Sequence, residues 1–368
     1  MANFMNNHML PIVHIEPNYE ELMKKEWSNL LYNFINQNLK DYNDIVWLSC
    51  NDDILAETVR EHPYLLDNGF RITFNKNFDI NWLFYFNKIK FHMTELSMNS
   101  SINLYTIKKY HTINWDPEGL ALNPNMTISF VIENPHLNIK IEDLCKNMNL
   151  GLNCILKIVN HPNSDFKYLS KNENLNDKFV LNFINKHWDW NYLFCNRGMF
   201  PLFLANYCKF VTDWEYVLTH SPMICELINI IHPNFFDTLD LNYLLSCNIY
   251  YPIQNINLNK RININALSSN KSLSFSIIKR FNNLKWNSFN ISANEVFDME
   301  AIQHNMKHFK FNVRGLEHNR NLTFKFIINN SNIFDWDFKN LALLDFKKER
   351  ETFFHNFKEI SFKYNQCY

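Results

Sequence analysis

Glycine is scarce in this chain, with five occurrences in 368 residues. Gly-rich phosphate loops need closely spaced glycines whose backbone amides approach the ligand, so the sequence argues against such a loop. The eight cysteines include no C-x-x-C pair, and without an export signal this favours reduced, buried thiols over disulfides. No apolar run approaches the roughly 18 residues of a membrane span, and MANFMNNHML lacks the basic and apolar regions of a signal peptide. We therefore expect neither a membrane span nor secretion.

The charge of the chain is nearly balanced, at a net −1, but it is unevenly distributed. Residues 16–67 carry eleven acidic and four basic residues, whereas residues 258–325 carry eleven basic and four acidic residues. The balanced total argues against binding of nucleic acid or anionic membranes by bulk charge alone. The two oppositely charged regions also allow head-to-tail self-association.

A repeat of about 24 residues runs along most of the chain. Its anchor is an aliphatic residue that recurs thirteen times, at Leu48, Ile72, Leu96, Leu120, Leu144, Leu169, Leu193, Leu218, Leu244, Leu267, Ile291, Leu316 and Leu341. In ten of the thirteen units an asparagine stands three residues after the anchor. Several units also place an aromatic residue five before it. Because independent columns share one phase, we interpret the chain as a repeat protein, degenerate near residues 205–260.

One unit shows how the repeat specifies two helices. Its key residues are Trp115, Asp116, Leu120, Asn123, Thr127, Val131 and Pro135. Asp116 and Thr127 are typical N-cap residues, whose side chains accept bonds from free backbone N–H groups. Trp115 and Leu120 stand where a hydrophobic staple fixes the entry to the first helix, and Pro135 ends the second. Other units repeat the pattern with Trp188, Leu193, Asn196, Trp286, Asn319 and Trp336.

The predicted helices, of roughly seven to nine residues, are too short to be stable alone and must stack on their neighbours. We therefore predict an all-α, elongated α-solenoid of about thirteen two-helix units over residues 43–345, on the order of 100 Å long unless tightly coiled. Residues 1–42 are expected to form an N-terminal segment and capping helix, and residues 346–368 a C-terminal capping helix and tail. A leucine-rich repeat is the alternative. It needs an apolar residue two before the anchor, where this chain has Thr94, Glu118, Glu142, Lys167, Asn191, Arg314 and Lys339.

The stretch WDPEGLALNPNMTISFVIENP resembles the short Trp/Asn-rich repeat found in many copies in large DNA viruses of amoebae and algae. HWDWNYLFCN, GLEHNRNLTFKFIINN and DWDFKNLALL resemble it too, so the resemblance covers roughly residues 43–345, with drift between 205 and 260. It implies a viral, intracellular protein of the host cytoplasm or the virion. No enzymatic activity belongs to the repeat itself, so the resemblance assigns no catalytic residue.

Few residues form a pattern that predicts chemistry. His304 and His308 have the spacing of a two-histidine metal pair, but Asn305 stands where a H-E-x-x-H motif needs glutamate, and surface histidines explain the pair better. We predict no catalytic site, metal site or cofactor. The candidate site is a basic patch for a partner, formed by Lys260, Arg261, Lys271, Lys279, Arg280, Lys285, Lys307, Lys310 and Arg314.

The sequence thus favours a non-catalytic scaffold that binds another protein through an extended solenoid surface. Within that class, a host-directed interaction protein competes with a structural, minor capsid-type component of the virion. The alternative class is a binder of nucleic acid through residues 258–325, where basic and aromatic residues alternate. The competing interpretation of that region is a solvated outer face whose aromatic residues belong to the core.

Overall fold

The computed structural model describes residues 19–39, 41–66, 69–86 and 88–365. Within these ranges the chain forms α-helices and short 3-10 helices and contains no β-strand. The predicted all-α repeat solenoid is therefore confirmed, and the leucine-rich repeat, which needs a strand in each unit, is not the fold of this chain. Residues 1–18, which include the expected N-terminal segment, and Cys367 lie outside the described residues.

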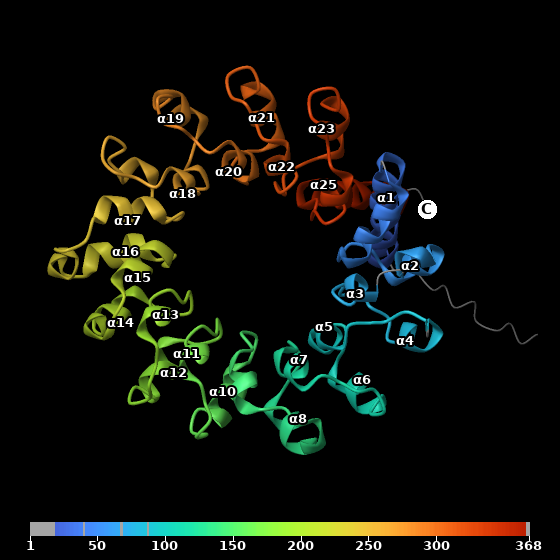
Figure 1. Cartoon of the computed structure of the whole chain (residues 1–368), viewed down its shortest axis with the longest axis horizontal. Helices are drawn as coiled ribbons and strands as arrows, with labels where there is room; N and C mark the ends of the chain where they lie inside the picture. Colours follow the sequence, from blue (N-terminus) through green and yellow to red (C-terminus); the bar gives the residue numbers. More distant parts are fainter. Residues whose placement is uncertain (1–18, 40, 67–68, 87, 366–368) are drawn as a thin grey trace, which may run out of the picture.

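The helices form two layers (Figure 1). The first helix of each unit contains or adjoins the anchor, and these helices are η1 (Tyr42–Cys50), α3 (Gly69–Ile72), α5 (Met93–Met98), α7 (Pro117–Leu122), α9 (Ile141–Cys145), α11 (Phe166–Leu169), α13 (Trp190–Leu193), α15 (Trp214–His220), α17 (Leu241–Cys247), α18 (Ile264–Ser268), α20 (Ser288–Ala293), α22 (Val313–Leu316) and α24 (Phe338–Leu341). In Figure 1 members of this set such as α5, α7 and α20 lie on the inside.

The second helices, such as α6, α8 and α21, lie on the outside in Figure 1. They are α2 (Ala56–Glu61), α4 (Trp82–Tyr85), α6 (Leu104–Lys109), α8 (Ile128–Glu133), α10 (Leu152–Ile158), α12 (Asp177–Asn182), α14 (Pro201–Ala205), α16 (Ile224–Ile230), α19 (Phe275–Arg280), α21 (Met299–Asn305) and α23 (Phe324–Asn329). Further 3-10 helices are η2 (Pro63–Leu66), η3 (Pro135–Leu137), η4 (Cys208–Phe210), η5 (Pro233–Phe236) and η6 (Ile253–Asn255). Two long helices, α1 (Tyr19–Asn38) and α25 (Lys347–Asn365), flank the repeats.

The predicted caps explain where these helices begin. Asp116 accepts a hydrogen bond from the backbone N–H of Gly119 at 2.6 Å, and Thr127 accepts one from that of Phe130 at 3.2 Å. Most repeat helices have four to six residues and are shorter than predicted, because turn and cap residues occupy much of each unit, whereas helices such as α10 and α15 have the predicted seven. The unit anchored at Leu244 departs from the two-helix prediction, since the 3-10 helix η6 stands where its second α-helix was expected.

The core lies between the two layers. Twelve of the thirteen anchors are 0% exposed. The remaining anchor, Leu244, is 8% exposed, and the adjacent Leu245 is buried to a similar extent, at 6% exposed. The tryptophans of the repeat also form hydrogen bonds through their indole N–H groups. The indole N–H of Trp188 donates to the carbonyl of Phe183 at 2.9 Å, and that of Trp286 donates to the carbonyl of Phe281 at 2.9 Å. Each ring thus also binds the C-terminal end of the preceding outer helix.

The repeated asparagines form a ladder from unit to unit. The side-chain N–H₂ of Asn75 donates to the carbonyls of Ser49 and Asn51, both at 2.9 Å. Asn123 and Asn196 make equivalent bonds one unit back, and both side chains are almost fully buried. Because a buried carbonyl without a donor is costly, these amides satisfy groups that the short helices leave unpaired. The asparagine is therefore the residue that joins adjacent units.

The solenoid closes into a ring, so the expected elongated shape is not what the structure has (Figure 1). The ladder continues across the closure, where Asn51 donates to the carbonyls of Ala342 at 2.9 Å and Leu344 at 3.2 Å. The physical reason is the shape of each unit. Small residues such as Gly315 let neighbouring inner helices approach closely, and large apolar residues fill the core between the two layers. Each unit is consequently a wedge, and thirteen wedges close the circle.

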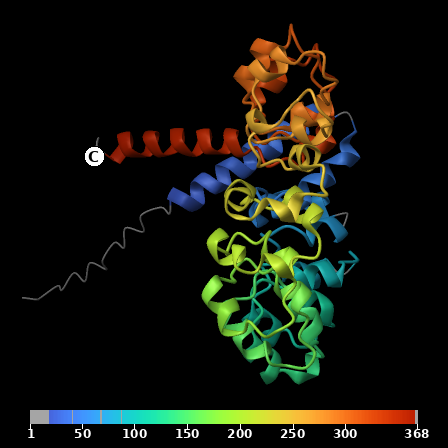
Figure 2. The ribbon, with the colours of Figure 1, turned by 90° about the vertical axis from the view of Figure 1, so that its left-hand side faces the viewer.

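The two end helices, α1 and α25, lie where the first and last units meet, which we call the seam. The expectation was that each would cover a free end of the solenoid, but a closed ring has no free ends. Trp27 of α1 stacks on Phe324 at 5.9 Å between ring centroids, and Phe34 stacks on Phe324 at 3.9 Å. The Arg350 guanidinium of α25 lies 2.7 Å from the carboxylate of Asp53, with side chains 27% and 14% exposed. The remainder of α25 projects from one face of the ring (Figure 2).

No helix of the described residues is both long and apolar enough to cross a bilayer. The seven cysteines within the described ranges are unpaired, and Cys145 is buried while the others are half-buried.

Candidate partner-binding rim

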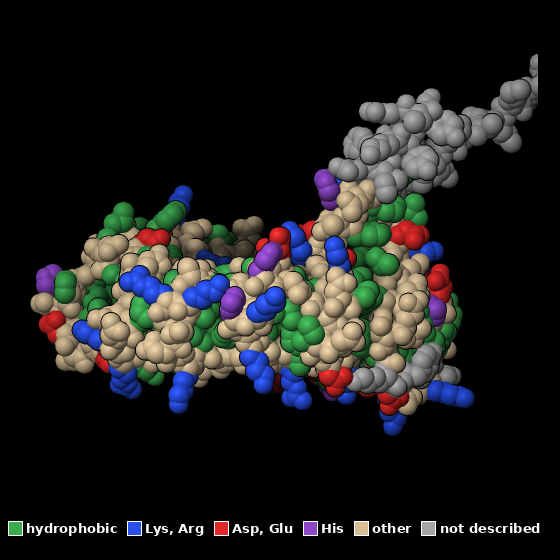
Figure 3. All heavy atoms as spheres, turned by 90° about the horizontal axis from the view of Figure 1, so that it is seen from above, with side chains coloured by type: hydrophobic (Ala, Val, Ile, Leu, Met, Phe, Trp, Pro, Cys, Tyr) green, Lys and Arg blue, Asp and Glu red, His purple; other side chains and the backbone are tan. Residues whose placement is uncertain are grey.

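All nine predicted basic residues are exposed. Lys279 and Arg280 end α19, Lys285 precedes α20, and Lys307 and Lys310 follow α21. Figure 3 views the ring from the side of α19, α21 and α23 and shows Lys and Arg side chains spread over this surface and projecting from one edge. We call this outer surface of the units anchored at Leu267, Ile291 and Leu316 the basic rim.

Most of this positive charge is not neutralised by the described part of the chain. Arg261 lies 3.8 Å from Asp240, with both side chains largely exposed. Lys260, Lys271, Lys279, Arg280, Lys285, Lys307, Lys310 and Arg314 form no ion pair within 4.0 Å of a described acidic residue. Surface pairs of this kind contribute little, so the rim has a net positive field that is available to a partner.

Three successive grooves lie between units of the basic rim. The first is lined by Ile256, Leu258, Arg280 and Phe281, and the third by Lys310, Phe311, Val313 and Phe334. The central groove is the largest, at about 600 Å³. Outer helices stand at a larger radius than inner ones in a closed ring, so wedge-shaped spaces open between them. The curvature of the ring therefore creates the grooves.

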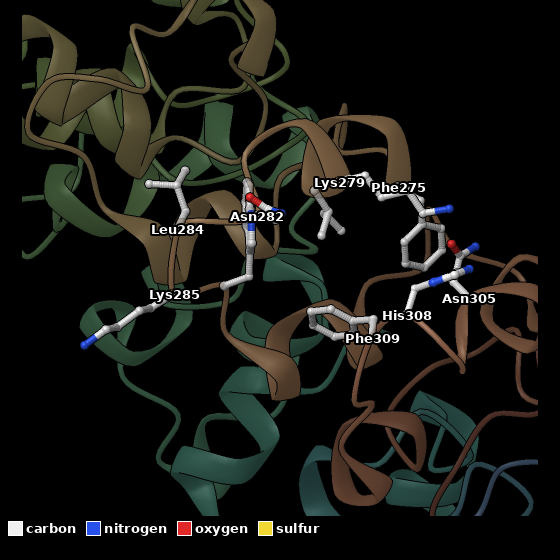
Figure 4. Close-up of a pocket in the computed structure, with 10 residues that line it drawn as sticks. Phe275, Lys279, Asn282, Leu284, Lys285, Asn305, His308 and Phe309 are labelled. Atoms are coloured by element: carbon white, nitrogen blue, oxygen red, sulfur yellow. The ribbon is translucent and has the colours of Figure 1, made fainter.

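The central groove joins apolar and cationic groups (Figure 4). Phe275 and Phe309 form one side, and Lys279 belongs to α19. Lys285 lies at the opposite end near Leu284, and its side chain points away from the other lining residues. Aromatic and aliphatic walls with a few polar groups are typical of sites that hold an anchoring side chain of a partner. The lysines add a preference for negative charge beside that anchor.

Asn305, 9% exposed, adds an unused acceptor to this groove. Its side-chain nitrogen donates to the carbonyl of Ala301 at 2.8 Å, whereas its Oδ1 is buried and accepts no hydrogen bond from a described residue. In Figure 4 the side chain lies beside Phe275. A buried acceptor without a donor is unfavourable, so this amide oxygen is a polar group that the described residues leave unsatisfied.

The structure brings together only some of the predicted residues. Lys279 and Lys285 share the central groove, while Arg280 and Lys310 line its two neighbours. Lys260, Arg261, Lys271 and Lys307 line none of the three grooves. Arg314 lies on the inner helix α22 and lines a cleft at the seam with Asp41 and Lys339. All nine residues are exposed, but only four of them line the three grooves, and their binding of a partner stays a prediction.

Sequence reasoning missed Asn305, His308 and Phe309 as groove residues. His308 entered the sequence analysis only as half of a possible metal pair, Asn305 only as the residue that breaks a H-E-x-x-H motif, and no local pattern singles out Phe309. The considered metal pair also differs from its expected geometry. Helix α21 ends at Asn305, so His304 and His308 are not on consecutive turns of one helix, and the His304 ring bonds the carbonyl of Glu300 at 2.8 Å.

Comparisons of the chain with models of protein families, with curated proteins and with solved structures give no match.

Proposed function

We propose that this protein is a non-catalytic repeat ring that binds an acidic segment of another protein through the basic rim. The observation that carries the proposal is the central groove, where Lys279 and Lys285 flank an aromatic surface and neither has an acidic partner among the described residues. An apolar anchor with carboxylates beside it would bury the anchor and meet both charges. The resemblance of the repeats supports a virus-encoded protein, in the host cytoplasm or in the virion.

A separate partner is favoured over self-association through the acidic region. Several acidic residues of the N-terminal part already have cationic partners within the ring. Asp53 lies 2.7 Å from Arg350, Asp52 lies 2.6 Å from Lys76, and Asp44 lies 3.7 Å from Lys339. A second copy would have to compete with these internal pairs, whereas a separate acidic segment meets the basic rim without that competition.

The test is binding of an acidic peptide with one aromatic residue, such as EEDFEE carrying a fluorophore, measured by anisotropy. We expect Lys279→Glu with Lys285→Glu to weaken binding at least about tenfold, because two attractions become repulsions. The peptide EEDSEE, which lacks the aromatic anchor, should bind more weakly than EEDFEE.

The matched control is Lys260→Glu with Lys271→Glu, which makes the same change of charge in the basic region but outside the grooves. It should weaken binding much less than the groove variant. If the two double variants lose affinity equally, the peptide senses only total charge and the groove is not its site. If EEDFEE does not bind the unaltered protein at about 100 mM salt, the proposal is wrong for this class of partner.

Nucleic acid is the second candidate, supported by the alternation of cations with aromatic residues such as Phe289, which is 39% exposed. Binding of a single-stranded oligonucleotide should then fall steeply as salt rises, because each phosphate contact releases counterions. Absence of binding at about 50–100 mM salt, or binding with a flat salt dependence, would exclude this candidate.

A different measurement distinguishes a structural component of the virion from a host-directed protein. Quantitative proteomics of purified particles should find the chain at a stoichiometric level if it is a structural component of the virion. A host-directed protein should be absent from particles and present in infected cells.

A further inference from the structure

A second cleft, of about 490 Å³, is lined by residues of the fifth to ninth units. These units form another sector of the ring from the basic rim (Figure 1). Five of its eleven lining residues are cationic or tyrosine side chains, namely Lys171, Tyr192, Arg197, Tyr216 and Tyr250. Its volume falls in the range of sites for small molecules. Neither the repeat pattern nor the proposed rim function accounts for this set of residues.

The asparagine ladder changes its residue type beside the cleft. In the eighth unit Ser221 takes the place of asparagine, and its hydroxyl donates to the carbonyl of Phe194 at 2.7 Å. The shorter side chain is followed by Pro222, which lines the cleft. Arg197 of the seventh unit reaches over this turn to the ninth, where its guanidinium donates to the hydroxyl of Tyr250 at 3.1 Å. These two residues are 53 positions apart, about two repeat lengths, whereas ladder bonds join adjacent units.

The cations of the cleft are held in place by aromatic groups. The ammonium of Lys171 lies 4.1 Å from the ring centroid of Tyr192 and 5.4 Å from that of Tyr168. The Arg197 guanidinium lies 5.7 Å from the ring centroid of Tyr250. Neither cation forms an ion pair with a described acidic residue, although the carboxylate of Glu173 also lines the cleft. Positioned cations that form no ion pair are typical of sites for anions.

The tyrosine rings of the cleft also contact one another and His220. The rings of Tyr216 and His220 stack with centroids 4.3 Å apart, and Tyr192 meets Tyr216 edge-on at 5.6 Å. Burial raises the pKa of the neighbouring Cys195 thiol to about 12, so this cysteine stays protonated at neutral pH. The cleft therefore offers aromatic surface and fixed cations without a reactive thiolate, which suits reversible binding.

We propose that this cleft binds a small phosphate monoester of mononucleotide size, with Arg197 and Lys171 contacting the phosphate and the tyrosine rings contacting the organic part. Arginine pairs well with phosphate because its fixed N–H donors match two phosphate oxygens, and the bond to Tyr250 positions the guanidinium beforehand. Aromatic rings contribute further by stacking on a base. The site is independent of the basic rim, since it shares no residue with the three grooves.

The test is isothermal titration of the intact protein with adenosine monophosphate, inorganic phosphate and adenosine. We expect the monophosphate to bind, inorganic phosphate to bind more weakly, and adenosine to bind at least about tenfold more weakly than the monophosphate. Arg197→Gln should lower affinity for the monophosphate about tenfold or more, and Lys171→Gln should also lower it. Tyr250→Phe, which removes only the hydroxyl that bonds Arg197, should lower it a few fold.

Lys279→Gln in the central groove of the basic rim is the matched control and should leave monophosphate binding unchanged. The acidic-peptide assay on Arg197→Gln should in turn be unaffected, so failure of this site and failure of the rim proposal are distinguishable. Thermal melting checks that each variant folds. If Arg197→Gln does not fold, the monophosphate affinities of Lys171→Gln and Tyr250→Phe test the proposal. The proposal is overturned if neither the monophosphate nor phosphate binds at up to about 10 mM, if adenosine binds as well as the monophosphate, or if the folded cleft variants bind like the unaltered protein.

Discussion

The side-chain amide of Asn51 donates a hydrogen bond to the carbonyl of Ala342 at 2.9 Å, although 291 positions separate the two residues in the chain. Asn75 makes the equivalent bond to Ser49 at 2.9 Å, one unit back. The first unit therefore meets the thirteenth as it would meet a preceding neighbour. The same asparagine side-chain hydrogen bond that joins adjacent units also closes the ring. Substitutions at the seam can therefore test whether this bond holds the ring closed.

Replacing Asn51 with alanine should weaken the seam specifically. The substitution leaves the carbonyls of Ala342 and Leu344 without these side-chain donors, which costs about 1–3 kcal/mol for a buried group. Hydrogen exchange should accelerate in α1, α24 and α25, and small-angle scattering should show a larger radius of gyration if the ring opens. Unchanged exchange in these helices would contradict the assigned role of Asn51.

Asn123→Ala is the matched control within the ring. Asn123 donates to the carbonyls of Ser97, Asn99 and Ile102, so its loss should destabilise by a comparable amount. Its exchange effect should centre on α5 and α7, and the seam helices should remain protected. The pair of variants thus separates general loss of a ladder bond from loss of closure.

The ion pair of Arg350 and Asp53 gives a second, electrostatic test of the seam. Arg350 Nη1 lies 2.7 Å from Asp53 and 2.9 Å from Asp345, and the pair is largely shielded from solvent. Arg350→Ala should destabilise by about 1.5–3 kcal/mol, because hydrogen bonds between charged groups are the stronger ones. A double-mutant cycle with Asp53→Ala, measured by urea unfolding, should give a clear coupling energy. Additive single effects would mean that the pair contributes nothing to closure.

The sequence predicts the local structure of this protein better than its shape. The cap at Asp116 and the anchor at Leu120 follow from local rules, because a cap and a staple involve residues only a few positions apart. The closure depends on a small rotation repeated thirteen times, and no single unit encodes its sum. Asn51 was recognised as a repeat asparagine, but its partner at Ala342 depends on that accumulated rotation.

The candidate site shows the same limit. The cluster of lysines around Lys279 is visible in the charge pattern, whereas the groove beside it is a consequence of curvature. Phe309 lines the groove, but nothing local in the sequence distinguishes an aromatic side chain that faces a groove from one that faces the core. The cleft beside Arg197 escaped prediction because its contact with Tyr250 spans two units.

Glu317 should make stability depend on pH. It stands one residue after its anchor, where Ser292 and other units have a hydroxyl, and it accepts bonds from the backbone N–H of Asp337 at 2.7 Å and the side chain of Asn340 at 3.0 Å. Burial raises the pKa of this carboxyl above its ordinary value of 4.5. The folded state thus favours the protonated form, and this contribution, complete below pH 4.5, is lost as pH rises through the raised pKa.

Glu317→Gln and Glu317→Ser remove that titration. The difference in unfolding free energy between each variant and the unaltered protein should therefore shift in favour of the variant as pH rises from 4.5, and level off above the raised pKa. Urea unfolding at a series of pH values measures it. Glu349 is also buried, and its raised pKa gives the whole protein a similar trend, so only the difference between variants reports Glu317. A difference independent of pH would refute the assignment.

Gly315→Ala should destabilise the ring by forcing two inner helices apart. A Cβ at this position would lie 2.4 Å from the carbonyl oxygen of Phe289 and 2.7 Å from the Cβ of Ser292, both on α20. Neither atom can move without the backbone, so we expect a loss of about 1–3 kcal/mol despite the better helix propensity of alanine. Gly151→Ala is the control, because a Cβ there meets nothing within 4 Å and its φ of −67° suits any residue. Its unfolding free energy, measured with urea, should stay within about 1 kcal/mol of the unaltered protein. Equal effects of the two substitutions would show that close approach of the inner helices does not set the wedge shape of the units.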